Sequence, residues 1–66
     1  MSSVISKNMK KYRAKLGVTQ WELYRQSGIP YNTILKIERG VSADPRIKTL
    51  IRIARALKVG VDDLIK

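Results

Sequence analysis

The 66-residue sequence contains no cysteine and no histidine. The absence of cysteine excludes disulfides, thiolate metal sites and cysteine nucleophiles, and the absence of histidine excludes imidazole acid–base chemistry. Acidic residues are also scarce, and their positions show no paired-acid pattern: Glu22, Glu38, Asp44, Asp62 and Asp63. We therefore expect neither an enzyme nor a metal site, and the sequence indicates no cofactor or small-molecule ligand.

Long apolar stretches are missing as well. No apolar run approaches the roughly 18 residues of a membrane-spanning helix, and the N-terminus lacks the apolar segment of a signal peptide. Glycine or proline repeatedly interrupts the chain, whereas a cationic membrane-binding helix would be continuous. The hydrophobic fraction of 44% is nonetheless ordinary for a packed protein. We expect a cytoplasmic protein without membrane contact, in which residues 1–66 form one domain.

Positive charge dominates the sequence. Fourteen lysines and arginines against five acids give a formal net charge of +9. Residues 7–15 and 46–58 each hold five basic residues and no acid. Such a field attracts polyanions, and every phosphate that is neutralised releases counterions. Taken alone, the charge leaves three interpretations open: nucleic-acid binding, an anionic membrane surface, or a merely soluble surface.

Apolar residues recur at helical spacing between the glycine and proline interruptions, and no segment alternates like a strand. This pattern predicts an all-α fold. The first helix is expected to carry one apolar stripe and to end before Gly17. The residues of this stripe are Ile5, Met9, Tyr12 and Leu16.

Two short helices are expected next. Thr19 followed three residues later by Glu22 is the capping-box pattern, which predicts a second helix that stops at Gly28. The third is expected from about Tyr31 to Arg39 and to end at Gly40. Its inward face is expected to be Ile34 and Ile37, with Ile29 packing just before its start.

The C-terminal part predicts a longer helix and a final turn. The longer helix has a stripe of Ile47, Leu50, Ile51, Ala54 and Leu57, flanked by Ile53 and Ala56. The final turn is expected over Val61–Ile65, where the helix dipole stabilises two negatively charged aspartates near its start.

The second and third helices, joined by a tight turn with a glycine, form a helix-turn-helix pattern at about residues 19–40. In that arrangement the second helix enters the major groove of DNA. The pattern by itself is weak, because many helical bundles contain such a hairpin.

A series of short motifs from residue 12 onward makes the helix-turn-helix prediction more specific. They are Tyr12-Arg13, Leu16-Gly17-Val18-Thr19-Gln20, Glu22-Leu23, Ser27-Gly28-Ile29, Thr33-Ile34, Ile37-Glu38-Arg39-Gly40, Asp44-Pro45, Thr49-Leu50, Ile53-Ala54, Ala56-Leu57, Val59 and Asp62-Asp63-Leu64-Ile65. In these residues the chain resembles the Cro/CI-type helix-turn-helix repressors, the Xre family. The resemblance implies a five-helix, lambda-repressor-like domain that binds double-stranded DNA. It also implies a transcriptional regulator, expected here to be a repressor that binds a palindromic operator as a homodimer.

The resemblance also assigns residue roles. Gln20 matches a glutamine that bonds a phosphate and braces the recognition helix, although a plain surface glutamine is the alternative. Arg13 and Glu38 match a buried ion pair that orients this helix, and the alternative for Arg13 is a place in the basic patch. The side chains expected to face DNA bases are Tyr31, Asn32, Thr33 and Lys36.

The chemistry of these side chains suits base edges. Asn32 can pair with adenine, Lys36 can donate to guanine, and a tyrosine edge or Thr33 can meet a thymine methyl. The hydroxyl of Thr33 has an alternative use at a phosphate or at the helix start. Phosphate contacts are expected from Arg39, Arg46 and Lys48, and from the indole N–H of an exposed Trp21.

Several residues depart from the family pattern. Pro30 replaces a serine or threonine cap, Tyr24 stands where alanine is usual, and Leu35 stands where a polar residue is common. The loop from Val41 to Asp44 is about one residue longer than in many relatives. These differences affect the fine geometry and the choice of operator.

A second functional class stays open at this point. Relatives of this fold also serve as antitoxins or anti-repressors, which act through a protein partner. Such a partner surface would consist of Leu35 and the tail residues Val59, Val61, Leu64 and Ile65. The same tail could instead close a symmetric dimer.

Overall fold

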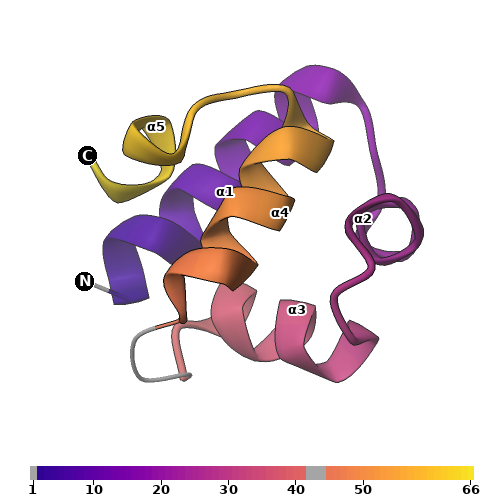
Figure 1. Cartoon of the computed structure of the whole chain (residues 1–66), viewed down its shortest axis with the longest axis horizontal. Coiled ribbons are helices and arrows are strands. Elements are labelled where there is room, and N and C mark those ends of the chain that lie inside the picture. The colour runs from indigo at the N-terminus through magenta and orange to yellow at the C-terminus, as the bar shows by residue number, and fades with distance from the viewer. Residues whose placement is uncertain (1, 42–44) are drawn as a thin grey trace.

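The computed structural model describes residues 2–41 and 45–66, and within these ranges the chain forms helices and no strand. The helices are α1 (Ser2–Leu16), α2 (Gln20–Ser27), α3 (Tyr31–Arg39), α4 (Ile47–Leu57) and α5 (Val61–Ile65). Helix α1 packs against α3, α4 and α5, whereas α2 packs against α3 and α4. Figure 1 shows both chain ends on the side where α5 lies beside α1. The predicted all-α fold with five helices is confirmed.

Local chemistry sets the bounds of α2 as predicted. The Thr19 hydroxyl accepts from the backbone N–H of Glu22 at 3.1 Å, and the Glu22 carboxylate accepts from the backbone N–H of Thr19 at 3.0 Å. Gly28 ends the helix at φ 73°, a left-handed conformation that glycine adopts without steric cost. Both the capping box and the stop are therefore confirmed.

Helix α3 begins differently. Pro30 occupies its N-cap position and supplies no side-chain hydrogen bond, as the sequence predicted. The helix closes at Gly40 (φ 72°), which donates to the carbonyls of Lys36 and Ile37. Its C-terminal end is thus held by backbone bonds, while its N-terminal end depends on side-chain packing.

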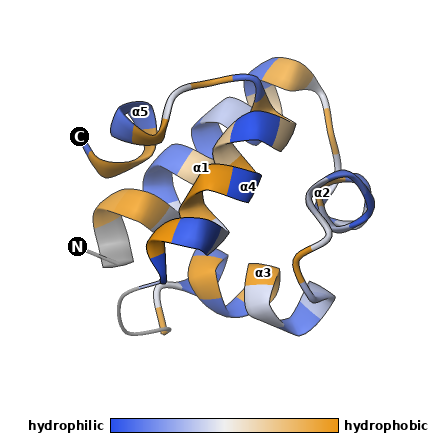
Figure 2. Cartoon of the chain, viewed as in Figure 1, coloured by the Kyte–Doolittle hydropathy of each residue, from blue (hydrophilic) through white to orange (hydrophobic). Residues whose placement is uncertain are grey.

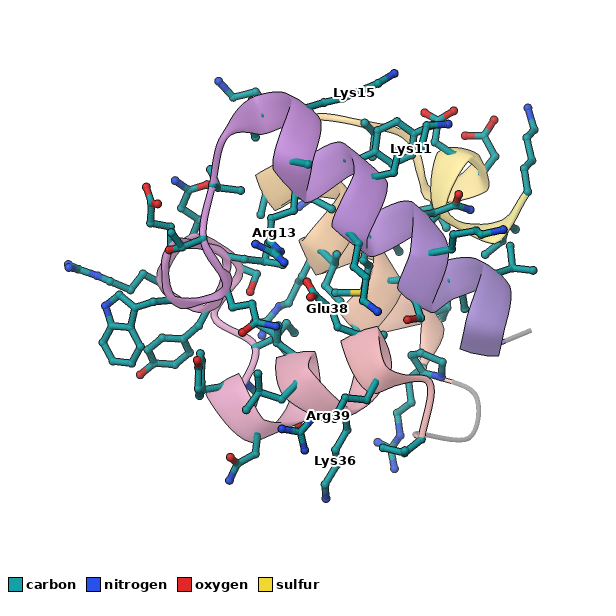
Figure 3. All side chains as sticks on the ribbon, turned by 180° about the vertical axis from the view of Figure 1, so that it is seen from behind. Lys11, Arg13, Lys15, Lys36, Glu38 and Arg39 are labelled. Atoms are coloured by element: carbon teal, nitrogen blue, oxygen red, sulfur yellow. The ribbon has the colours of Figure 1, made fainter. Side chains whose placement is uncertain are left out.

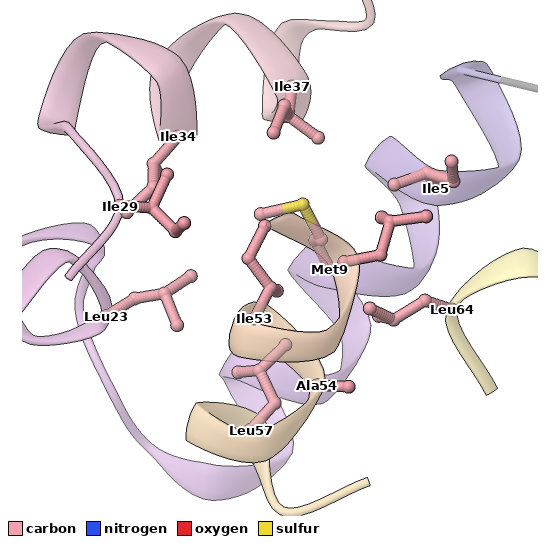
Figure 4. Close-up of a cluster of buried hydrophobic side chains, with 11 residues drawn as sticks. Ile5, Met9, Leu23, Ile29, Ile34, Ile37, Ile53, Ala54, Leu57 and Leu64 are labelled. Carbon is pink, nitrogen blue, oxygen red and sulfur yellow. The ribbon is translucent and has the colours of Figure 1, made fainter. Parts of the chain in front are cut away.

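The core draws on every helix. Figure 2 shows apolar segments on the facing sides of the helices, and Figure 4 shows these side chains converging. The core consists of eleven buried residues: Ile5, Met9, Leu23, Ile29, Ile34, Ile37, Leu50, Ile53, Ala54, Leu57 and Leu64. The three isoleucines expected beneath the recognition helix are among them. This packing fixes α3 on the rest of the domain.

Two residues of the predicted stripes are exposed to solvent. Leu16 is 37% exposed and Ile47 is 60% exposed. Each lies in a terminal turn, Leu16 at the end of α1 and Ile47 at the start of α4. Helical spacing gives the direction of a side chain, but not whether another element covers it.

The buried face of α4 is also shifted from the predicted stripe, and its buried residues are Leu50, Ile53, Ala54 and Leu57. Ile53, expected at the edge of the stripe, is fully buried, whereas Ile51, expected on it, is only half-buried. The reason is that α4 packs against α1, α2 and α5 together, so that more than one of its sides faces a neighbour.

The tail differs from expectation in one respect. Leu64 is fully buried, so it is not available for a partner. Val59 and Val61 are half-buried against the core, and Ile65 is 41% exposed. The amide of Asn8 on α1 donates to the Leu64 carbonyl at 2.8 Å and ties α5 down. The tail therefore completes the core of its own chain.

Two further points bear on the sequence predictions. The departure expected at Val41 to Asp44 falls largely on residues 42–44, which lie outside the described residues. Across the described ranges, no helix combines the length and the apolar character needed to cross a membrane.

Candidate nucleic-acid interface

Helices α2 and α3 are joined by three residues, Gly28, Ile29 and Pro30. The turn is anchored at both ends. The Gly28 N–H donates to the Tyr24 carbonyl at 3.0 Å, and the Ile29 N–H donates to the Ser27 hydroxyl at 3.1 Å. Ile29 itself is only 4% exposed. The turn thus has a fixed geometry, and with it the angle at which α3 leaves α2.

The two faces of α3 differ sharply. Ile34 and Ile37 point into the core and are at most 1% exposed. Asn32, Lys36 and Arg39 are exposed, and their spacing of four and three residues places them on one side of the helix. Figure 3 shows Lys36 extending away from α1 and from the body of the domain. This outer face carries side chains that suit base edges and phosphates.

The other residues expected at DNA bases are less accessible. Tyr31 and Thr33 are half-buried at the start of α3. The structure therefore brings the four expected base-reading residues onto one helix, but presents Asn32 and Lys36 more fully than their neighbours.

An ion pair connects α3 to α1. Figure 3 shows Arg13 of α1 and Glu38 of α3 pointing toward each other. The guanidinium donates from Nε to Oε2 at 2.8 Å and from Nη2 to Oε1 at 3.1 Å, a two-pronged contact. The side chain of Glu38 is 2% exposed and that of Arg13 is 24% exposed. The pair expected from the family resemblance is therefore present, and its acidic member is buried.

Gln20 joins the same carboxylate. Its Nε2 donates to Oε1 of Glu38 at 3.0 Å, which links the start of α2 to α3. Arg13 in addition donates from Nη1 to the Val18 carbonyl at 3.2 Å. Three segments thus meet at one buried acid. The geometry matches the bracing role expected for Gln20.

Sequence reasoning missed one further connection. Ser6 of α1 is 7% exposed, and its hydroxyl donates to the backbone carbonyl of Glu38. No sequence pattern distinguishes this serine from a surface residue, because its partner lies 32 residues away. Ser6 and Arg13 together hold the last turn of α3 against α1.

Aromatic side chains surround the start of α3. Trp21 is 55% exposed, as predicted, and its ring lies 4.9 Å from that of Tyr24 and 5.7 Å from that of Tyr31. The i, i+3 spacing of Trp21 and Tyr24 indicates that these two rings share one side of α2. Their contact with Tyr31 could not be foreseen from spacing.

Basic residues continue beyond α3. Arg46 is exposed immediately before α4, and Lys48 is exposed in the first turn of that helix. The acid of α3, Glu38, is buried and paired, so the outer face of this helix carries positive and neutral groups only. Among the described residues no three potential metal ligands gather.

Comparison with known proteins gives consistent matches. The sequence model of the helix-turn-helix family matches residues 9–64. Two uncharacterized HTH-type transcriptional regulators of Archaeoglobus fulgidus are each 34% identical over 56 residues, which is 85% of this chain and 79% and 78% of theirs. An uncharacterized HTH-type transcriptional regulator of Methanocaldococcus jannaschii is 36% identical over 56 residues, 85% of this chain and 83% of its own. A search of the solved structures gave no match.

Proposed function

The chain belongs to the Cro/CI-type helix-turn-helix family of transcriptional regulators, and on this basis we propose that it is a repressor that binds a specific double-stranded operator. It acts as a homodimer in the cytoplasm on a palindromic site. The proposal includes no catalytic step, no cofactor and no small-molecule ligand.

One observation carries the proposal, namely the division of α3 into a buried face and an exposed polar face. Ile34 and Ile37 fasten the helix to the core, while Asn32, Lys36 and Arg39 project from its free side. The major groove of B-DNA, about 12 Å wide, admits an α-helix in this orientation. This outer face carries no acid, and the chain has a net charge of +9. The face therefore attracts the phosphates of DNA.

Asn32 and Lys36 supply the base readout in this proposal. The amide of Asn32 can accept and donate at once to the Hoogsteen edge of adenine, and the ammonium of Lys36 donates to O6 or N7 of guanine. The half-buried Tyr31 offers a ring edge to a thymine methyl. Thr33 takes a lesser part, because its side chain is half-buried at the helix start.

Phosphate contacts hold the helix in register. The backbone N–H groups at the start of α2 attract an anion, and the bond from Gln20 to Glu38 fixes the side chain at that end. Trp21 can add its indole N–H, and Arg39 and Arg46 add charge on either side of the loop after α3. Such contacts strengthen binding to any duplex and leave sequence choice to the bases.

The size and the surface of the domain support the homodimer. A domain of 66 residues buries only about 60% of the surface that its unfolded chain exposes, a smaller share than a larger domain buries. Val41, after the end of α3, and Ile47, at the start of α4, are 69% and 60% exposed. A second copy that covered them would remove apolar surface from water. Two-fold symmetry would then set two α3 helices about 34 Å apart, one helical turn of DNA.

The test of the dimer is sedimentation at micromolar concentration. We expect a dimer on operator DNA, with two chains per duplex. Monomer alone, both free and on DNA, would contradict the homodimer while leaving DNA binding itself intact.

The test of operator binding is selection from randomised duplexes and from genomic fragments. We expect enrichment of one short palindromic sequence, with binding that weakens as salt rises. Recovery of no preferred sequence, together with stable capture of a protein partner, would instead favour an antitoxin or anti-repressor.

A further inference from the structure

Three aromatic rings form a closed cluster where α2 meets α3. Trp21 and Tyr24 lie 4.9 Å apart at an interplanar angle of 48°, and Trp21 and Tyr31 lie 5.7 Å apart at 64°. Tyr24 and Tyr31 lie 6.1 Å apart at 79°, an edge-to-face contact. All three separations fall within the range of attractive ring pairs. Each ring therefore contacts both others.

The side of the cluster that belongs to α2 is fixed. Tyr24 is half-buried and packs against the hydrophobic core. Trp21 lies one turn earlier on the same side of the helix, and it is the more exposed ring at 55%. The capping box and the C-cap glycine hold both ends of α2, so the backbone that carries the two rings is fixed.

Tyr31 meets the two rings at the start of α3, which has no side-chain cap. It is the first residue of α3, and the preceding Pro30 provides no side-chain cap. Its neighbour Asn32 is exposed on the outer face. The two rings of α2 therefore decide how the Tyr31 side chain leaves the helix, and whether its edge faces outward with Asn32.

We propose that Tyr24 is a positioning residue for sequence readout: through the ring cluster it holds Tyr31 so that its ring edge meets one base pair, at a thymine methyl. Tyr24 itself does not touch DNA. The inference rests on the proposed function, since it concerns how the same interface selects its operator. It assigns a role in specificity to a residue of α2 that is half-buried against the core.

The proposed positioning role of Tyr24 and a purely structural role predict different effects on DNA binding. A residue that only stabilised the fold would, when removed, weaken binding to every duplex alike. A residue that positions Tyr31 would change the preference at one base pair, and only while Tyr31 is present. The dependence on Tyr31 is the distinguishing property.

The experiment measures base preference by competition between duplexes that differ at single positions of the selected operator. Tyr31→Ala first identifies the base pair at which Tyr31 acts. We expect Tyr24→Ala to reduce the preference at that same pair by about threefold to tenfold, and to have no further effect in the Tyr31→Ala background. Tyr24→Phe should restore the preference, because the ring contacts do not need the hydroxyl.

The controls keep the outcomes distinct. Circular dichroism and thermal melting show whether each variant is folded, and Tyr24→Leu, which fills the core side without a ring, replaces Tyr24→Ala if the latter unfolds. Unchanged preference in a folded ring-less variant, or an equal change with and without Tyr31, would overturn the inference. If the unmodified chain selects no DNA sequence at all, it is the proposed function that fails.

Discussion

Replacement of Glu38 by alanine is expected to lower the free energy of unfolding by about 3 kcal/mol, the lower end of the cost of breaking a buried ion pair. The carboxylate is 2% exposed and accepts from Arg13 and Gln20. Its loss leaves the guanidinium without its partner. Arg13 is 24% exposed, so water hydrates it in part, which places the effect at the lower end. Urea unfolding followed by circular dichroism measures the change.

The matched control is the exposed ion pair at the C-terminus. Asp62 and Lys66 lie 3.5 Å apart, with side chains 67% and 74% exposed. Asp62→Ala removes the same charge, yet it should cost less than about 1 kcal/mol, as exposed pairs do. Equal losses from Glu38→Ala and Asp62→Ala would mean that the buried network does not stabilise the domain.

Glu38 also connects stability to function. Its side chain and its backbone carbonyl receive bonds from α1 and α2, at Arg13, Gln20 and Ser6. Because a domain of this size has only about 5 kcal/mol of stability to lose, Glu38→Ala should weaken DNA binding at physiological temperature through unfolding. The loss should shrink at low temperature, where more of the chain stays folded.

Lys36→Ala and Asn32→Ala are each expected to weaken binding to the preferred operator by about 1–3 kcal/mol. Both side chains are exposed on the outer face of α3, so neither change should disturb the core. The loss reflects missing bonds to base edges, and it should be much smaller on unrelated duplexes. Fluorescence anisotropy with labelled duplexes at fixed salt gives both affinities.

Two variants serve as controls for charge. Lys15→Ala removes the same charge from the end of α1, and Figure 3 shows Lys15 on the opposite side of the domain from Lys36. Its effect should be slight. Arg46→Ala, at the start of α4, should instead weaken all duplexes alike and reduce the salt slope by about one. If Lys15→Ala and Lys36→Ala behaved alike, only the overall field would matter.

The features that the sequence predicted well are local. The capping box of Thr19 and Glu22, and the stops at Gly28 and Gly40, each involve residues within one helical turn. The apolar spacing of α3 likewise identified Ile34 and Ile37, because a helix converts spacing into direction. Local rules of this kind need no knowledge of neighbouring elements.

The features that it did not predict depend on tertiary packing. Leu16 and Ile47 have the right spacing but lie beyond the cover of other helices. Leu64 was expected at a surface and lies in the core, held by Asn8 from the opposite end of the chain. The contact of Arg13 with Glu38 spans 25 residues, and only the family resemblance pointed to it.

The central claim is that α3 reads base sequence in the major groove. The most direct test compares the base-preference profile of the unmodified chain with that of Lys36→Ala, each obtained by selection from randomised duplexes at the same salt concentration. The profile of Lys36→Ala should lose its preference at one or two base pairs and keep the rest. A profile unchanged at every position would show that another surface reads the sequence.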